Sequence, residues 1–477
     1  MMRTVRRIIG SSWTWLIAAA LLAVYTLLAP TLAQRIGSGD PRPVGTAEDV
    51  EALADRDDVN VLFLLIDTLR ADRLGTYGYE RATSPALDRL AGRGVRFARH
   101  LAQSSWTKCS MASLWTSLYP NRSGVTRFDE VLSEEAELPA EILTAAGFRT
   151  AGIFRNGWLM SYFGFGQGFE TYVRPIPEPV SPGVRAENPT LTSGGSDLDA
   201  TAAASEFLRV HGHERWFLYM HLMDVHQYLY SEDTALFGTS YSDIYDNSIL
   251  WTNKVLEPFF EELARRGHLE KTLVVVTSDH GEAFGERGFE GHARHVFRET
   301  TEVPFILSFP FRFEQPVVVS DRTRGVDVWP TVLDLLGLDE LEVGDGRSLR
   351  PEILAALGRQ TGSPPDDDLV AYAHLDQNWG RANQPQNTTL AVVDDDLRYV
   401  SYRDAEGEVQ QELLYDAGSD PLELTNVAAS APEDLERIRG LAAAYLANSK
   451  VPFEPNERLE LDELQLNQLR ALGYQVP

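Results

Sequence analysis

The chain has 477 residues, which suits one large α/β domain with an appended unit, or two domains. Hydrophobic residues make up 43% and charged residues 24%, as in ordinary globular proteins. The formal net charge of −27 argues against a nucleic-acid-binding function, because so acidic a surface repels phosphates. An anionic substrate is not excluded, since a bound metal reverses the local potential of a pocket. The one cysteine, Cys109, excludes an internal disulfide and a cysteine-rich metal site.

The N-terminus has the residue pattern of a targeting segment. Three arginines within the first seven residues precede an uncharged run from Ile8 to Ala33, which is long enough to cross a bilayer. Positive charge before such a run predicts a cytoplasmic N-terminus, with the remaining chain outside the cell membrane. The alternative is a secretory signal peptide cleaved near Ala33. Both interpretations place the main domain outside the cytoplasm, and the first also predicts the membrane as a partner.

The central part of the chain reads as an α/β domain. Val61–Ile66 is a continuous apolar run, as expected of a strand buried on both faces of a parallel sheet. Helix-like stretches such as Ser84–Leu90 and Ile244–Arg266 separate such runs. This alternation predicts a doubly wound, mostly parallel sheet flanked by helices, with its site at the carboxyl ends of strands. The other apolar runs are Trp216–Met220, Leu273–Val276 and Pro304–Leu307.

The C-terminal part has shorter elements. Four short strand-like segments predict a small antiparallel sheet, and residues 432–448 and 458–473 look helical. The four segments are Leu369–Ala373, Thr388–Val393, Arg398–Tyr402 and Glu412–Leu414. We therefore expect an anchor or signal segment over 1–33, a tether over 34–58, a catalytic α/β domain over 59–365 and a C-terminal subdomain over 366–477.

Acidic residues end two of the apolar runs. Asp67 directly follows Val61–Ile66, and Asp279 with His280 follows Leu273–Val276 after two residues. Each aspartate alone could be a helix cap or a turn residue. Together they predict one site for a divalent metal ion, because carboxylates with one imidazole suit Ca, Mn, Mg or Zn. The sequence does not choose among these ions.

Hydroxyl and histidine residues gather near the same strands. The segment Ser104–Pro120 places hydroxyls just before the helix-like stretch Met111–Leu118, where a metal-activated hydroxyl could attack an anionic ester. Ordinary helix capping is the alternative. Half of the ten histidines lie in three short stretches, which favours a site. They are His221, His226, His280, His292 and His295.

Nine stretches in order along the chain resemble the sulfatase family of the alkaline-phosphatase superfamily. They are Asn60–Asp72, Thr83–Ala91, Thr116–Val125, Ser278–Glu282, Val303–Ile306, Val326–Gly337, Asp345–Leu349, Leu414–Pro421 and Leu469–Tyr474. The resemblance implies that Asp67, Asp279 and His280 bind the metal and that His226 contacts the transferred anion. It also implies that Asn156 contacts the anion and that His292 or His295 fills a further active-site position.

This sequence departs from the family at the nucleophile. Sulfatases carry a cysteine or serine that becomes formylglycine, and the aligned residue here is Thr107, which cannot be converted. Cys109 falls at the family's proline position, and Thr68 replaces a second acidic ligand. A threonine nucleophile with few metal ligands is similar to the phosphotransferase and phosphodiesterase branches. We therefore expect an enzyme that cleaves sulfate or phosphate esters through a covalent threonine intermediate on Thr107.

Three alternatives stay open. The first is a formylglycine-type sulfatase modified at Cys109. The second is a phosphotransferase that acts on membrane or envelope glycans or lipids. The third is a sulfatase-like binding protein without activity, which should have lost its metal ligands. The expected partner is an anionic ester substrate, no nucleic acid is expected to bind, and the oligomeric state is not readable from the sequence.

Overall fold

The structure is a computed structural model, and it describes residues 40–175, 195–359, 370–381, 383–454, 458–461, 463 and 465–466. The predicted anchor Ile8–Ala33 lies outside these residues, as does most of the predicted helix 458–473. Among the helices in the described ranges, none is long and apolar enough to span a membrane.

The main sheet has eight strands in the order β10-β2-β9-β6-β1-β5-β3-β4. Neighbouring strands run parallel except at β9, which is antiparallel to both β2 and β6. The strands are β1 (Asn60–Ile66), β2 (Val95–Leu101), β3 (Arg149–Phe154), β4 (Thr171–Val173), β5 (Trp216–Leu222), β6 (Thr272–Thr277), β9 (Phe305–Ser308) and β10 (Val317–Arg324). The predicted doubly wound, mostly parallel sheet is therefore confirmed.

Both faces of the sheet are covered, which explains the continuous apolar run of β1. Every residue of β1 is buried. Because side chains alternate along a strand, Leu62, Leu64 and Ile66 join one hydrophobic cluster, with α4 (Pro85–Ala91), α9 (Asp197–His211) and α10 (Tyr241–Arg265). Val61, Phe63 and Leu65 join the other, with α5 (Thr107–Thr116), α7 (Pro139–Ala145) and α12 (Val328–Leu335).

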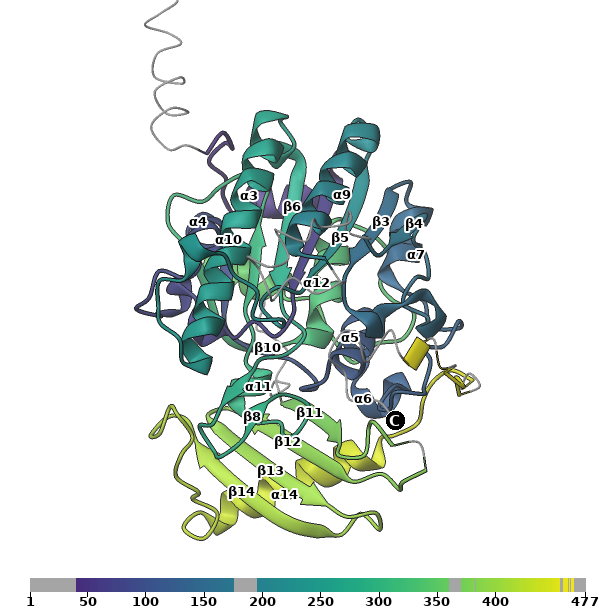
Figure 1. Cartoon of the computed structure of the whole chain (residues 1–477), viewed down its shortest axis with the longest axis vertical. Helices are drawn as coiled ribbons and strands as arrows, with labels where there is room; N and C mark the ends of the chain where they lie inside the picture. The colour runs from purple at the N-terminus through teal and green to yellow at the C-terminus, as the bar shows by residue number, and fades with distance from the viewer. Residues whose placement is uncertain are drawn as a thin grey trace, which may run out of the picture.

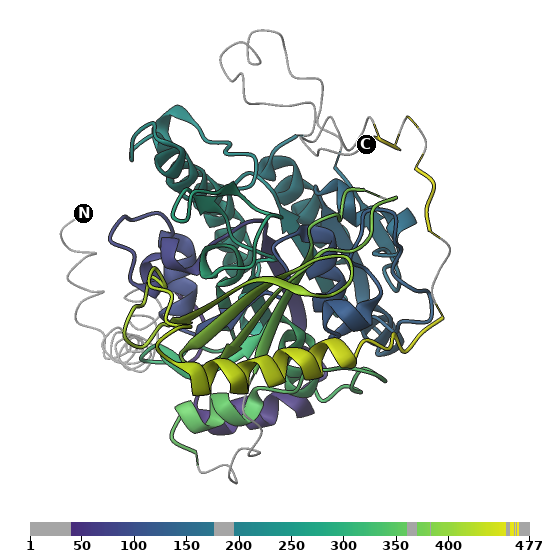
Figure 2. The ribbon, with the colours of Figure 1, turned by 90° about the horizontal axis from the view of Figure 1, so that it is seen from below.

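The C-terminal part forms a separate four-stranded antiparallel sheet at one end of the molecule (Figure 1), as predicted. Its strands are β11 (Ala371–Asp376), β12 (Thr388–Asp394), β13 (Leu397–Arg403) and β14 (Val409–Asp416). Helix α14 (Pro432–Ala447) runs along one face of this sheet (Figure 2) and shares a hydrophobic cluster with it. A two-stranded hairpin of β7 (Ala283–Phe284) and β8 (Glu290–Gly291) belongs to the main domain.

Short helices complete the described chain. The α-helices are α3 (Ala47–Glu51), α6 (Pro120–Ser123), α11 (Arg298–Thr301) and α13 (Arg350–Ala356). The 3-10 helices are η1 (Ala52–Asp55), η2 (Ala71–Arg73), η3 (Gly75–Tyr77), η4 (Gly157–Leu159), η5 (Ser161–Phe163), η6 (Glu232–Thr234), η7 (Leu269–Lys271) and η8 (Gly325–Asp327).

Two features differ from the sequence-based expectation. Residues 40–58 fall in the segment predicted as a tether, yet they pack on the domain, because Val50 and Leu53 are buried in the main core. Arg42 also donates to Ser308 Oγ at 2.5 Å and to the Phe309 carbonyl at 2.9 Å.

Helix α5 begins at Thr107 rather than at Met111. Its polar first turn, which looks like a loop in the sequence, is buried against the loop that follows β6.

A candidate metal and nucleophile site

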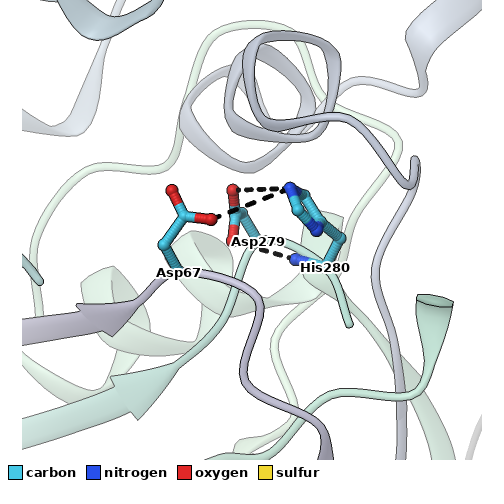
Figure 3. Close-up of side chains that lie close together, drawn as sticks. All are labelled: Asp67, Asp279 and His280. Carbon is cyan, nitrogen blue, oxygen red and sulfur yellow. Dashed lines mark hydrogen bonds and ion pairs between the residues drawn. The ribbon is translucent and has the colours of Figure 1, made fainter. Parts of the chain in front are cut away.

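Three candidate metal ligands converge at one edge of the main sheet (Figure 3). Asp67 follows β1, and Asp279 and His280 follow its parallel neighbour β6. Because parallel strands end at the same edge of the sheet, the three residues lie together there. His280 Nε2 lies 3.3 Å from Asp279 Oδ2 and 3.8 Å from Asp67 Oδ1. One ligand atom from each residue lies within 4.8 Å of the others, and all three residues are buried.

The atoms that face one another here are hydrogen-bond acceptors. His280 Nδ1 lies 3.0 Å from the Gly281 carbonyl, so Nδ1 carries the proton and Nε2 presents a lone pair. Among the described residues, Asp67 Oδ1 and Asp279 Oδ2 are buried and have no hydrogen-bond partner. Buried acceptors left unpaired beside one another are costly unless a cation lies between them. The donor set therefore fits a divalent metal ion.

The second oxygen of Asp67 is held by donors. Asp67 Oδ2 accepts from Asn156 Nδ2 at 2.6 Å and from His221 Nε2 at 2.9 Å. The Tyr219 hydroxyl lies 2.7 Å from His221 Nδ1 and fixes the orientation of that ring. These contacts orient Asp67 so that Oδ1 is left for a cation.

The two carboxyl groups differ in acidity. Burial alone would raise the pKa of Asp67, but the charge of His226 and the hydrogen bond from His221 outweigh it, and the pKa falls below its usual range. Burial and the negative charge of Asp67 raise the pKa of Asp279. The negative charges of the two carboxylates repel each other at this short distance, and a bound cation would offset that repulsion.

Thr107 lies directly against this cluster. It is the first residue of α5, and its Oγ1 lies 3.1 Å from His280 Nε2 and 3.3 Å from Asn156 Nδ2. The Ser110 hydroxyl, one turn further along α5, donates to the Asp279 carbonyl at 2.6 Å. The helix is thereby docked on the metal-site loop with its N-terminus, which favours anions, at the site.

The residues next to Thr107 point elsewhere. Cys109 is buried in the hydrophobic core, and burial raises the pKa of its thiol to about 12. Lys108 is also buried, and its Nζ donates to the Phe128 carbonyl at 2.7 Å and lies 3.6 Å from the centroid of the Phe163 ring. Neither side chain contacts the three candidate ligands.

Two of the predicted histidines lie beside the cluster. The His292 ring stacks on His280 with centroids 4.5 Å apart, and the His226 ring lies 4.9 Å from His292. His292 Nδ1 is 3.2 Å from both oxygens of Glu282, which also accepts from the Tyr228 hydroxyl at 2.8 Å. His295 lies apart, between Phe289 and Phe297. The structure thus brings His292, and not His295, to the site.

Three polar neighbours of the site, Glu282, Tyr219 and Tyr228, were not assigned from the sequence, and His221 was grouped with the site histidines without a role of its own. Glu282 is the last residue of Ser278–Glu282, a stretch that resembles the sulfatase family, so the resemblance could have placed Glu282 near the site. The contacts of His221, Tyr219 and Tyr228 depend on chain packing that no local pattern encodes.

The sulfatase family model matches residues 59–338, more than half of the chain. This chain belongs to the sulfatase family. The predicted resemblance is therefore confirmed, and the matched range holds Asp67, Thr107, Asp279 and His280. Members of this family generally bind a divalent metal, in agreement with the donor set described above.

The curated relatives carry sulfatase names. Arylsulfatase K of Xenopus laevis is 32% identical over 173 residues, which are 36% of this chain and 31% of that protein. Steryl-sulfatase of Mus musculus is 26% identical over 441 residues, with 69% of each chain covered. This chain spans about a third of the length of the arylsulfatase K relatives that it matches. These names support the prediction of a sulfuric ester hydrolase.

Solved structures share the fold. A structure described as a sulfatase from Bacteroides thetaiotaomicron has a TM-score of 0.67 at 19% identity, with 86% of this chain and 96% of that chain covered. Phosphonate monoester hydrolases are also among the structural neighbours. At this level of identity the likeness establishes a fold shared with sulfatases and phosphonate monoester hydrolases, and nothing about the substrate.

Proposed function

We propose that this sulfatase-family protein hydrolyses sulfate esters through a covalent intermediate on Thr107, with a divalent cation held by Asp67, Asp279 and His280. The observation that carries the proposal is the position of Thr107 Oγ1, 3.1 Å from His280 Nε2 at the N-terminus of α5. The sulfatase names of the curated relatives support sulfate as the transferred group.

The reaction has two steps. Thr107 Oγ1 loses its proton to solvent and forms a bond to sulfur, while the bond from sulfur to the ester oxygen breaks and the alcohol leaves with a proton. Water then attacks the sulfur of the sulfothreonine, which releases sulfate and restores the hydroxyl. A bound divalent cation would lower the pKa of the hydroxyl and offset the charge of the ester.

The surrounding side chains supply orientation and charge. The Asn156 amide lies 3.3 Å from Thr107 Oγ1, so it is placed to donate to an oxygen of the transferred group as well. The His292 ring stacks on His280, and the His226 ring lies next to His292. Both histidines can therefore contact the anion or the oxygen of the leaving alcohol. Held donors of this kind stabilise the charge that develops on the transferred group in the transition state.

Phosphate or phosphonate esters are the second candidate substrates. Two observations favour them: Thr107 stands where sulfatases have formylglycine, and Thr68 replaces a second acidic ligand. The same two steps would then pass through a phosphothreonine. Transfer to an alcohol in place of water is the corresponding transferase activity.

The site of action is also a proposal. We infer that the catalytic domain works outside the cytoplasm and stays with the membrane, because three arginines precede the uncharged run Ile8–Ala33. Fractionation of cells that express the full chain should recover it with membranes and accessible to external protease. A soluble product that begins near Gln34 would instead support a cleaved signal peptide.

The function is tested by activity of the purified full chain in detergent, loaded separately with Ca, Mn, Mg or Zn. Aryl sulfate, phosphate monoester and phosphodiester substrates are compared for wild type, Thr107→Ala, Thr107→Ser and Cys109→Ala. We expect Thr107→Ala to lower kcat by about 10⁴-fold or more with metal content retained. Thr107→Ser should keep part of the activity, and Cys109→Ala should lose only about 1 kcal/mol of stability.

Two outcomes would contradict the proposal. Inactive Cys109→Ala with active Thr107→Ala, together with an aldehyde at position 109, would establish the formylglycine alternative. No turnover of any ester by the metal-loaded wild type would favour a binding protein.

A further inference from the structure

Trp379 belongs to the C-terminal sheet in sequence but to the main domain in its contacts. It lies in the loop that follows β11, and its side chain packs against the main hydrophobic core. By contrast, Tyr372, an aromatic residue on β11 itself, packs in the hydrophobic cluster that includes α14. The loop after β11 therefore reaches across to the catalytic domain.

The Trp379 ring contacts both segments that hold the Thr107 hydroxyl. It stacks on Trp106 with centroids 4.5 Å apart, and Trp106 directly precedes Thr107. It also meets Trp158 edge-on at 6.1 Å. The Trp158 amide donates to Asn156 Oδ1 at 2.9 Å, so this second ring is coupled to the amide that contacts Thr107.

The same side chain fixes the segment that carries His292. Trp379 Nε1 donates to the Ala293 carbonyl at 3.2 Å, and the Ala293 amide donates to the Ser105 carbonyl at 2.8 Å. Ala293 has a φ of 57°, a left-handed conformation that is strained for an alanine. Nearby, Gln377 Nε2 donates to the Arg294 carbonyl at 2.8 Å. The surrounding contacts hold this strained segment in place.

We propose that Trp379 is a positioning residue of the active site, supplied by the C-terminal sheet, that fixes Thr107, Asn156 and His292 relative to one another. The proposal rests on the proposed function for its catalytic consequence. Trp379 contacts Trp106, Trp158 and Ala293, which lie one or two residues from Thr107, Asn156 and His292. Within the described part of the chain, its ring contacts and hydrogen bonds include none of the three candidate metal ligands. Loss of its ring should therefore slow turnover while the metal stays bound, because displacement of reacting groups by about 1 Å costs up to about 100-fold in rate.

The test compares Trp379→Ala, Trp379→Phe and the matched control Tyr372→Ala in the full, metal-loaded chain. Tyr372 lies on β11 and stacks on Tyr445 at 4.5 Å, so its loss removes an aromatic contact on the same strand away from the site. We expect Trp379→Ala to lower kcat about 10- to 100-fold with KM within about threefold of wild type and unchanged metal content. Trp379→Phe keeps the stacking but not the hydrogen bond, and should recover part of kcat. Tyr372→Ala should lower Tm but not kcat.

A second readout does not depend on activity. Hydrogen exchange of the Ala293 amide should accelerate in Trp379→Ala and stay unchanged in Tyr372→Ala. Equal exchange in both variants, or equal losses of kcat in both, would overturn the positioning role. A rise in KM with kcat unchanged would overturn it too, since Trp379 would then bind substrate. If the wild type turns over no ester, the proposed function fails while the exchange result still decides the role of Trp379.

Discussion

At the scale of single residues, two buried carboxylate oxygens that lack hydrogen-bond partners among the described residues indicate where a cation would bind. Asp67 Oδ1 and Asp279 Oδ2 have no hydrogen-bond partner in the described structure, and both face His280 Nε2. Replacement of either aspartate with asparagine keeps its volume but removes a negative charge. We expect Asp67→Asn and Asp279→Asn each to lower the metal content at least about 10-fold and to abolish activity. Elemental analysis of the purified variants is the measurement.

Asp58→Asn is the control for these two variants, because Asp58 is partly exposed and pairs with Arg56 at the surface, away from the candidate site. It should keep both metal and activity. Full metal occupancy and full activity in the two site variants would remove the metal-site assignment.

A second prediction at this scale concerns the thiol. Burial raises the pKa of Cys109 to about 12, so its thiolate fraction at pH 7 is about 10⁻⁵, against a few per cent for a free thiol. The thiol is also sterically shielded in the core. Native protein should therefore resist a thiol-specific disulfide reagent from pH 7 to pH 9, and one thiol should react after denaturation. Rapid reaction of the native protein at pH 7 would show an accessible thiol and weaken the case against Cys109 as a nucleophile.

At the scale of elements, α5 connects Thr107, the proposed nucleophile, to the candidate metal site. Ser110 Oγ donates to the Asp279 carbonyl, whereas Ser113 Oγ on the same helix is buried and has no hydrogen-bond partner in the part of the chain that the structure describes. Ser110→Ala should cost about 1 kcal/mol of unfolding free energy and lower metal affinity about 10-fold. Ser113→Ala is the matched control and should change neither by a measurable amount. Urea unfolding and metal titration distinguish the two variants. Equal effects of the two substitutions would mean that the Ser110 hydrogen bond does not link α5 to the metal site.

The sequence predicts these elements unevenly. The buried strands stand out because β1, β5 and β6 are continuous apolar runs covered on both faces, so Asp67 and Asp279 could be placed at their ends before the structure was known. The start of α5 could not be placed, because its polar first turn is buried by tertiary packing and not by any apolar pattern. The hydrogen-bond partners of Asp67 and of Glu282 could not be predicted either, because they lie on segments far away in the sequence that only the fold brings together.

At the scale of the whole molecule, a buried ionic network ties the C-terminal sheet to the main domain. Arg398 on β13 lies 2.9 Å from Glu302 Oε1 and 2.9 Å from Glu423 Oε2, and its side chain is only 1% exposed. Without Arg398, the buried Glu423 carboxylate keeps only the more distant Arg287, 3.8 Å away, as a salt-bridge partner among the described residues. We expect Arg398→Ala to lower the unfolding free energy by about 3–5 kcal/mol, measured by urea denaturation.

Arg437→Ala serves as the control for the network. Arg437 also belongs to the C-terminal part, but its pair with Asp394 is 48% exposed on the arginine side. Asp394 is buried, but solvent reaches the Arg437 guanidinium, so this pair should contribute less than about 1 kcal/mol. Similar losses in both variants would mean that the buried network does not join the two parts.

The central claim is that Thr107 forms the covalent bond to the transferred group. It is tested most directly by quenching the metal-loaded protein during turnover of an aryl ester and sequencing the peptide around Thr107 by mass spectrometry. The account predicts that this peptide gains the mass of one sulfo or phospho group at Thr107 and that the gain is absent from Thr107→Ala. An unmodified Thr107 during turnover, with an aldehyde in place of the thiol at Cys109, would contradict the account.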